Sequence, residues 1–177
     1  TRPTVSSVNP PPNSTTSNFA IVPLPANGEV CFYTITGLDL RVDVLGYFTD
    51  GGNGTFVPAS PARVTDTRDK YRSEMNLGTA GNYLVAGTTG TLDLGGHRGI
   101  PTNAKSLSLN LTIAFPTAAG TITMWPCGNQ PNYKTITYAA NAVTPIGQQM
   151  LMSTAGEICV QATTNVHVIV DVTGWWT

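Results

Sequence analysis

The stretch SLSLNLTI, residues 106–113, decides the fold class of this 177-residue chain. Apolar and polar residues alternate strictly along it, so its leucines and Ile113 share one face while hydroxyl and amide side chains share the other. A period of two residues is typical of a β-strand with one buried face, and such strands belong to antiparallel sheets. The stretch therefore predicts an antiparallel sheet with a core on one side.

The same alternation recurs at two other places. Near the end of the sequence the apolar positions are Val166, Val168, Val170 and Val172, with His167, Ile169 and Asp171 opposite them. Upstream, the apolar positions are Leu40, Val42 and Val44. We predict half-buried strands at both places. A turn at residues 118–120 is expected to join the 106–114 strand to residues 121–125.

No window of the sequence has an amphipathic helical period. The sequence therefore predicts an all-β fold, either an antiparallel β-sandwich or a small barrel of short strands.

An internal repeat defines the domain organisation. VDVLGYFTD at residues 42–50 matches VDVTGWWT at residues 170–177, and GEVC at residues 28–31 matches GEIC at residues 156–159. The cysteine and the aspartate are 12 residues apart in both copies. We therefore predict that residues 1–50 are the C-terminal half of a preceding repeat unit, residues 51–54 a Gly-rich linker, and residues 55–177 a complete unit. The first half that would belong to residues 1–50 is missing from this sequence.

Composition excludes several classes of partner. Only 11% of the residues are charged and the net charge is −1, which predicts no binding to nucleic acid or to an anionic membrane surface. No apolar run approaches the roughly 20 residues of a membrane span, so we expect no membrane insertion. Threonine, serine, asparagine and glycine dominate the polar positions, a choice common in secreted all-β modules. The expected location is therefore secreted, extracellular or at the cell surface.

The three cysteines are consistent with a secreted or extracellular location. Cys127 in WPCG and Cys159 in GEIC both lie inside the complete unit, which makes them a candidate disulfide in an oxidising compartment. Such a bond would stabilise the fold by about 3–4 kcal/mol through chain entropy. The repeat places the partner of Cys31 in an upstream WPCG, so Cys31 is either a free buried thiol or part of a longer array. The alternative is that all three cysteines are unpaired and pack as small apolar residues.

Four motifs occur in order over nearly all of residues 55–177. They are FVPASPARVTDTR (residues 56–68), GIPTNAKSLSLNLT (99–112), PTAAGTITMWPCG (116–128) and VIVDVTGWW (168–176). The unit resembles a tandem repeat module of secreted and surface actinobacterial proteins, marked by a PARLLDTR-like opening, WPCG and a closing VDVxGYF. Val64-Thr65 and Trp175-Trp176 depart from that pattern. The resemblance implies an all-β fold, secretion, and attachment or display by an accessory module without catalytic residues.

The segment RVTDTR concentrates charge. Arg63, Asp66 and Arg68 are candidates for structural ion pairs, with Asp171 and Asp43 as acceptors on late strands. A bidentate clamp between arginine and aspartate would hold the first and last strands of the unit together. The alternative is that the arginines bind a carboxylate or the hydroxyls of a sugar.

Catalytic arrangements lack support in the sequence. His97 and His167 do not have the spacing of a zinc site, and Ser106 is not flanked by the glycines of a nucleophile elbow. We therefore predict no catalytic residues, no metal and no cofactor. A secreted hydrolase is the least favoured interpretation.

Aromatic residues are the better functional candidates, because sugar-binding modules stack pyranose rings on exposed aromatic faces. The candidate ligand-binding residues are Trp176, Trp175, Tyr71, Tyr83 and Trp125. The alternative is that the tryptophans cover the core. Residues 69–83 depart from alternation and are interpreted as a long loop, where ligand contacts often lie.

Two functions follow from these residues. The first is a non-catalytic extracellular module for adhesion or attachment, whose partner is a polysaccharide or another cell-envelope component. The second is a structural, self-assembling subunit in which the unpaired strands of residues 1–50 join the complete unit, another chain or a missing half-repeat by β-strand augmentation.

Overall fold

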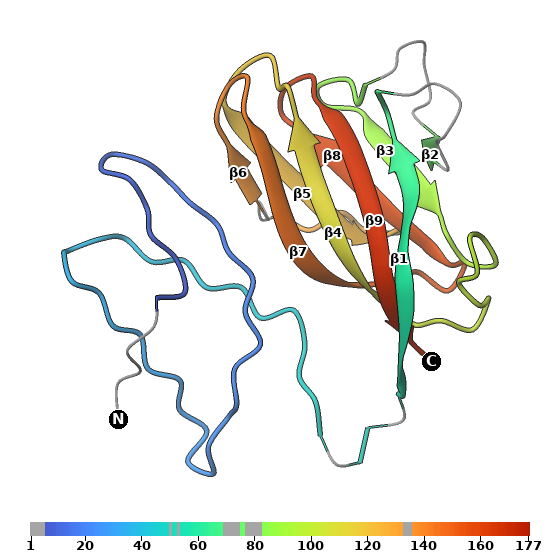
Figure 1. The fold of residues 1–177 in the computed structure, drawn as a ribbon, viewed down its shortest axis with the longest axis horizontal. Coiled ribbons are helices and arrows are strands. Elements are labelled where there is room, and N and C mark those ends of the chain that lie inside the picture. The colour runs from blue at the N-terminus through green and yellow to red at the C-terminus, as the bar shows by residue number, and fades with distance from the viewer. Residues whose placement is uncertain (1–5, 50, 53, 69–74, 77–82, 133–135) are drawn as a thin grey trace.

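The computed structural model describes residues 6–49, 51–52, 54–68, 75–76, 83–132 and 136–177 (Figure 1). Within these ranges the chain forms nine β-strands and no helix. The strands are β1 (Phe56–Asp66), β2 (Met75–Asn76), β3 (Thr89–Asp93), β4 (Ser106–Ala114), β5 (Gly120–Pro126), β6 (Ile136–Tyr138), β7 (Val143–Leu151), β8 (Glu157–Ala162) and β9 (His167–Trp176). Accordingly, no helix in the described ranges has the length and apolar character of a membrane span.

Two antiparallel sheets pack face to face as a β-sandwich (Figure 1). The strand order is β1-β9-β4-β7 in the four-stranded sheet and β2-β3-β8-β5-β6 in the five-stranded sheet. The predicted all-β antiparallel fold is confirmed, and of its two alternatives the structure is the sandwich and not a closed barrel. Thr55 and Thr177 exchange backbone hydrogen bonds of 3.3 and 3.2 Å, so the start and the end of this sandwich lie side by side.

The core contains the residues that alternation marked as apolar. Leu107, Leu111 and Ile113 of β4 are fully buried, as are Val168 and Val170 of β9. Burial of each such side chain stabilises the fold by about 1.5–3 kcal/mol relative to exposure. Ile169 is an exception, because it was expected on the polar face and is only 4% exposed. It lies between Asp66 and Thr112 in the sheet register, on a part of the outer face that is also buried at Asp66.

The two halves of the sandwich interdigitate. Strand β6 pairs with β5, β7 pairs with β4, β8 lies between β3 and β5, and β9 lies between β1 and β4. Each of the last four strands thus takes its ladder partners from the first five. The second half of the unit, β6 to β9, therefore depends on the first half for its sheet hydrogen bonds.

Residues 6–49 form extended loops beside the sandwich, without a strand (Figure 1). The predicted strand at residues 40–44 is therefore wrong for this chain, and its apolar side chains are exposed, Val42 by 54% and Val44 by 83%. The pairing pattern gives the physical reason. The matching strand β9 is stabilised by its ladders with β1 and β4, whereas residues 40–44 pair with no strand among the described residues.

Candidate functional site

Strand β9 ends in two tryptophans that point to opposite faces of the sheet. Trp175 is half-buried and packs against the core. Trp176 is half-buried on the other face, with its ring centroid 4.5 Å from that of Phe56 and 6.1 Å from that of Phe48. Gly174 permits this arrangement, because a Cβ atom there would lie 2.6 Å from the ring of Phe56.

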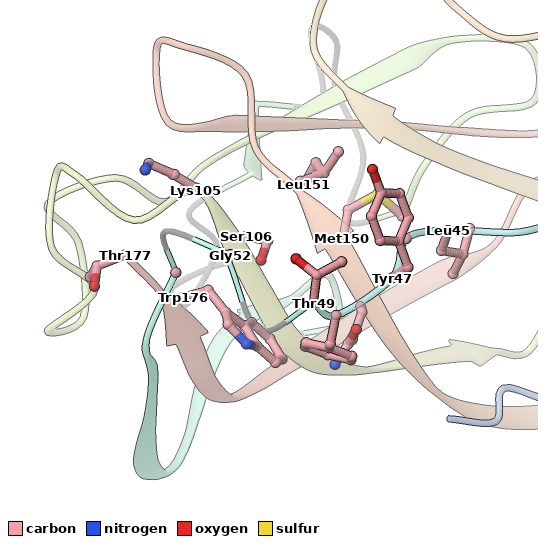
Figure 2. A pocket seen from close by; sticks show the side chains of 14 residues that line it. Leu45, Tyr47, Thr49, Gly52, Lys105, Ser106, Met150, Leu151, Trp176 and Thr177 are labelled. Carbon is pink, nitrogen blue, oxygen red and sulfur yellow. The ribbon is translucent and has the colours of Figure 1, made fainter. Parts of the chain in front are cut away.

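A cleft of about 450 Å³ surrounds Trp176 where residues 45–49, 52 and 54 approach the start of β4 and the end of β7 (Figure 2). Among the described residues, the lining contains three aromatic rings, several hydroxyl groups, one side-chain amide and one charged side chain. The lining residues are Leu45, Gly46, Tyr47, Phe48, Thr49, Gly52, Gly54, Lys105, Ser106, Gln149, Met150, Leu151, Trp176 and Thr177. Figure 2 shows Trp176 and Tyr47 on different sides of Thr49.

This lining suits a ligand that is polar at its edges and apolar on one face. The rings of Trp176, Tyr47 and Phe48 offer flat apolar surfaces. The amide of Gln149 and the hydroxyl of Ser106 can exchange hydrogen bonds with a bound molecule. A small number of polar groups in an apolar cleft is the usual composition of a binding site.

Sequence reasoning found only part of this cleft. It named Trp176, but it did not include Tyr47, Phe48, Gln149 or Lys105 among the candidate ligand-binding residues. No motif marks these residues. The sheet register brings them together, because Ser106 lies between Leu151 of β7 and Trp176 of β9.

The other predicted ligand-binding aromatics do not join this cleft. Tyr83 is exposed and makes an edge contact with His167, 6.0 Å between centroids, at the opposite end of β9 from Trp176. A strand of this length separates them by about 30 Å. Tyr71 lies outside the described residues.

Trp125 is unsuited to stacking on a ligand, because it is only 4% exposed. Its sheet partner is Cys159, whose disulfide to Cys127 lies on the same face of the sheet as the indole. The buried indole Nε1 makes no hydrogen bond within the described residues. Trp125 is therefore part of the interior, in agreement with the alternative that it covers the core.

The charged cluster joins β1 to β9. Arg63 donates two hydrogen bonds to the carboxylate of Asp171, from Nε at 2.9 Å and from Nη2 at 3.2 Å, and a third to Asp66 at 3.1 Å. Arg68 donates to both oxygens of Asp66, at 2.9 and 2.8 Å. These bonds engage both guanidinium groups internally, as expected for structural ion pairs.

Asp43 does not take part in this cluster. It lies 3.6 Å from Arg41, and both side chains are exposed. The expectation that Asp43 accepts from the 63–68 segment is therefore wrong, because residues 6–49 do not form the strand that would place it there.

The ion pairs shift the pKa values of their members. Hydrogen bonds from Arg68 hold the pKa of Asp66 below its ordinary value, against the opposing effect of burial. The hydrogen bond to Asp171 raises the pKa of Arg63, and the hydrogen bond to Asp66 raises that of Arg68. All three groups are charged at neutral pH.

The disulfide Cys127–Cys159 is confirmed, with an S–S distance of 2.02 Å. Cys31 is a free thiol and it is exposed, so of its two alternatives the buried free thiol is wrong. Within the described ranges, no three histidine, cysteine or acidic side chains gather as a metal site.

The cleft around Trp176 is thus the candidate binding site, and the charged cluster and the disulfide are structural. The cleft combines residues that are far apart in the sequence, from the 45–54 segment, β4, β7 and β9. No protein-family model matches the chain, and no curated protein or solved structure is significantly similar to it.

Proposed function

We propose that this chain is a non-catalytic extracellular module that binds a polysaccharide, such as one of a cell envelope, through the cleft around Trp176. The observation that carries the proposal is the meeting of three aromatic rings with amide and hydroxyl groups and one cation. A flat ring covers the apolar face of a pyranose, while the neighbouring polar groups bind its hydroxyls. An uncharged polymer is favoured because Lys105 is the one charged side chain among the described residues of the lining.

Two further observations support an extracellular role. The Cys127–Cys159 disulfide persists in oxidising compartments and is uncommon in reducing ones. The four motifs of residues 55–177 resemble the tandem repeat module of secreted and surface actinobacterial proteins, which serves attachment or display.

The test is a polysaccharide binding screen on the wild-type chain, followed by titration of Trp176→Ala against each polymer that binds. We expect the substitution to weaken binding tenfold or more, because loss of a central aromatic anchor typically costs about 2 kcal/mol or more. Circular dichroism and the melting temperature establish that the variant is folded.

Phe115→Ala is the matched control. Phe115 is 55% exposed and follows the end of β4 that is remote from Ser106 and the cleft. Its truncation should leave the affinity unchanged. Absence of polysaccharide binding by the wild type, or equal losses in the two variants, would overturn the proposal.

A further inference from the structure

We propose that residues 6–49 are the second half of a two-part module that folds by pairing with a polypeptide equivalent to residues 55–128, which supplies strands like β1 to β5. A cysteine of that partner, at the position of Cys127, then forms a disulfide with Cys31. This inference does not rest on carbohydrate binding, although residues 45–48 also line the cleft around Trp176.

A constant offset relates residues 6–49 to the second half of the complete unit. It is 128 positions both from Cys31 to Cys159 and from Asp43 to Asp171. The turn before β8 is already present in the matching place. The amide of Gly28 donates to the carbonyl of Pro25 at 2.8 Å with φ of 72°, and Gly156 donates to Ser153 at 2.9 Å with φ of 81°.

The apolar positions of the two copies differ in burial. Ile158 and Val160 of β8 are fully buried, whereas the matching Val30 and Phe32 are 43% and 59% exposed. The same holds for β9, where Val172 is 2% exposed and the matching Val44 is 83% exposed. Residues 6–49 thus keep the apolar pattern of two core strands without the sheets that would bury it, and burial of this surface would drive association.

Two glycines of residues 6–49 match glycines that are in close contact with the first half. A Cβ atom on Gly174 would lie 2.6 Å from the ring of Phe56 in β1, and one on Gly156 would lie 2.9 Å from Cα of Gly95. The matching Gly46 and Gly28 have no atom within 4 Å of such a Cβ. The missing neighbours are therefore counterparts of Phe56 and Gly95, and both belong to the first half of a unit.

The ion pair between Asp171 and Arg63 also indicates that the missing partner of residues 6–49 is the first half of a unit. Asp171 accepts two hydrogen bonds from Arg63 of β1. Among the described residues, the matching Asp43 forms an ion pair only with its neighbour Arg41, at 3.6 Å. The partner therefore needs an arginine at the place of Arg63.

The Cys31 thiol is the fourth feature of residues 6–49 that lacks the partner of its match in the complete unit. Cys159 is bonded to Cys127, whereas the matching Cys31 is free and exposed. When the halves meet, the thiols of Cys31 and of the partner form one S–S bond and give two electrons and two protons to a disulfide oxidant such as oxidised glutathione, which becomes two thiols.

The apolar residues, the two glycines, Asp43 and Cys31 all indicate the same partner, because β6 to β9 take their ladder partners from β1 to β5. The partner is thus a chain segment with the β1 to β5 pattern, whether it precedes residues 6–49 covalently or belongs to a separate polypeptide.

The test is a fusion that places residues 55–128 directly before Thr1 of the full 177-residue chain, since the offset makes residue 128 the counterpart of the position before Thr1. The protein is refolded with reduced and oxidised glutathione. We expect hydrogen exchange at residues 28–33 and 40–48 to slow at least a hundredfold relative to the unmodified chain. Peptide mass spectrometry should show Cys31 bonded to the added copy of Cys127.

Two controls separate pairing from added length. A fusion with the order of the added residues scrambled should leave exchange at residues 28–33 fast. Gly46→Val should remove the protection of residues 40–48 in the fusion, where a counterpart of Phe56 is present. The same substitution should leave the melting temperature of the unmodified chain unchanged, because Gly46 has open space there.

Unchanged exchange in residues 6–49 of the fusion, or equal protection by the scrambled segment, would contradict the inference. A disulfide from the added Cys127 to Cys159, with Cys31 left free, would also contradict it, because the added half would then have replaced its own copy in the complete unit. None of these readouts involves a carbohydrate, so failure here is distinct from failure of the binding proposal.

Discussion

At the scale of single residues, Asp66 links the charged cluster. Its side chain is only 8% exposed and accepts hydrogen bonds from Arg63 and Arg68. Because these bonds lower its pKa in the folded state, Asp66 stabilises the fold above its ordinary pKa near 3.8. That contribution is lost as the pH falls through the lower, folded-state pKa.

Asp66→Asn should therefore lower the free energy of unfolding by about 1.5–3 kcal/mol at pH 7, the usual value of hydrogen bonds to charged groups. The difference from the wild type should shrink as the pH is lowered below about 4. Urea denaturation over a pH series measures both effects. Asp39→Asn, an exposed carboxylate outside the sandwich, should follow the wild-type profile, and a pH-independent difference at Asp66 would refute its titration as the cause.

At the scale of elements, the disulfide fixes the connection that follows β5 to the neighbouring strand β8 across 32 residues of chain. The double substitution Cys127→Ser, Cys159→Ser should lower the free energy of unfolding by about 3–4 kcal/mol, because the unfolded chain loses its cross-link. Denaturant titration without a reductant provides the measurement. Cys31→Ser is the control and should leave stability unchanged, since Cys31 is free and exposed; a similar loss there would assign it a structural role.

The elements show how far sequence reasoning reaches. Alternation at residues 106–113 predicted strand β4 and its buried face, because the period of side chains is a local property. The order of strands in the sheets was not predictable, since β4 lies between β7 and β9, which follow it by tens of residues. The prediction at Leu40, Val42 and Val44 failed for the same reason, because a correct local pattern lacked its partners.

The candidate site was predicted less well than the fold. Trp176 was named because an aromatic pair at a strand end is visible in the sequence. Gln149 and Ser106 became its neighbours only through the register of three strands. Trp125 stands in an equally aromatic motif but is buried.

At the scale of the whole molecule, the sandwich of residues 55–177 and the extended residues 6–49 differ in how well their backbone is protected from a protease. The sandwich has two hydrogen-bonded sheets around a core, whereas many apolar side chains of residues 6–49 are exposed. Resistance to a protease follows hydrogen bonding and burial of the backbone.

Limited proteolysis of the 177-residue chain should therefore first remove residues that precede Thr55. The remaining fragment should keep the melting temperature of the intact chain, because the core and the disulfide both lie within it. Mass spectrometry of the cleavage products and calorimetry of the fragment measure these outcomes. A large drop in the melting temperature of the fragment would show that residues 6–49 stabilise the sandwich.

The backbone hydrogen bonds between Thr55 and Thr177 also have a mechanical consequence. Strands β1 and β9 are antiparallel neighbours, and the residues that enter and leave the sandwich lie at the same end of this pair. A pulling force applied between these two residues would therefore peel the two strands apart from one end and break the hydrogen bonds of the ladder one after another. The sandwich should yield at a lower force when it is stretched between its own ends than when the same strands are sheared along their length.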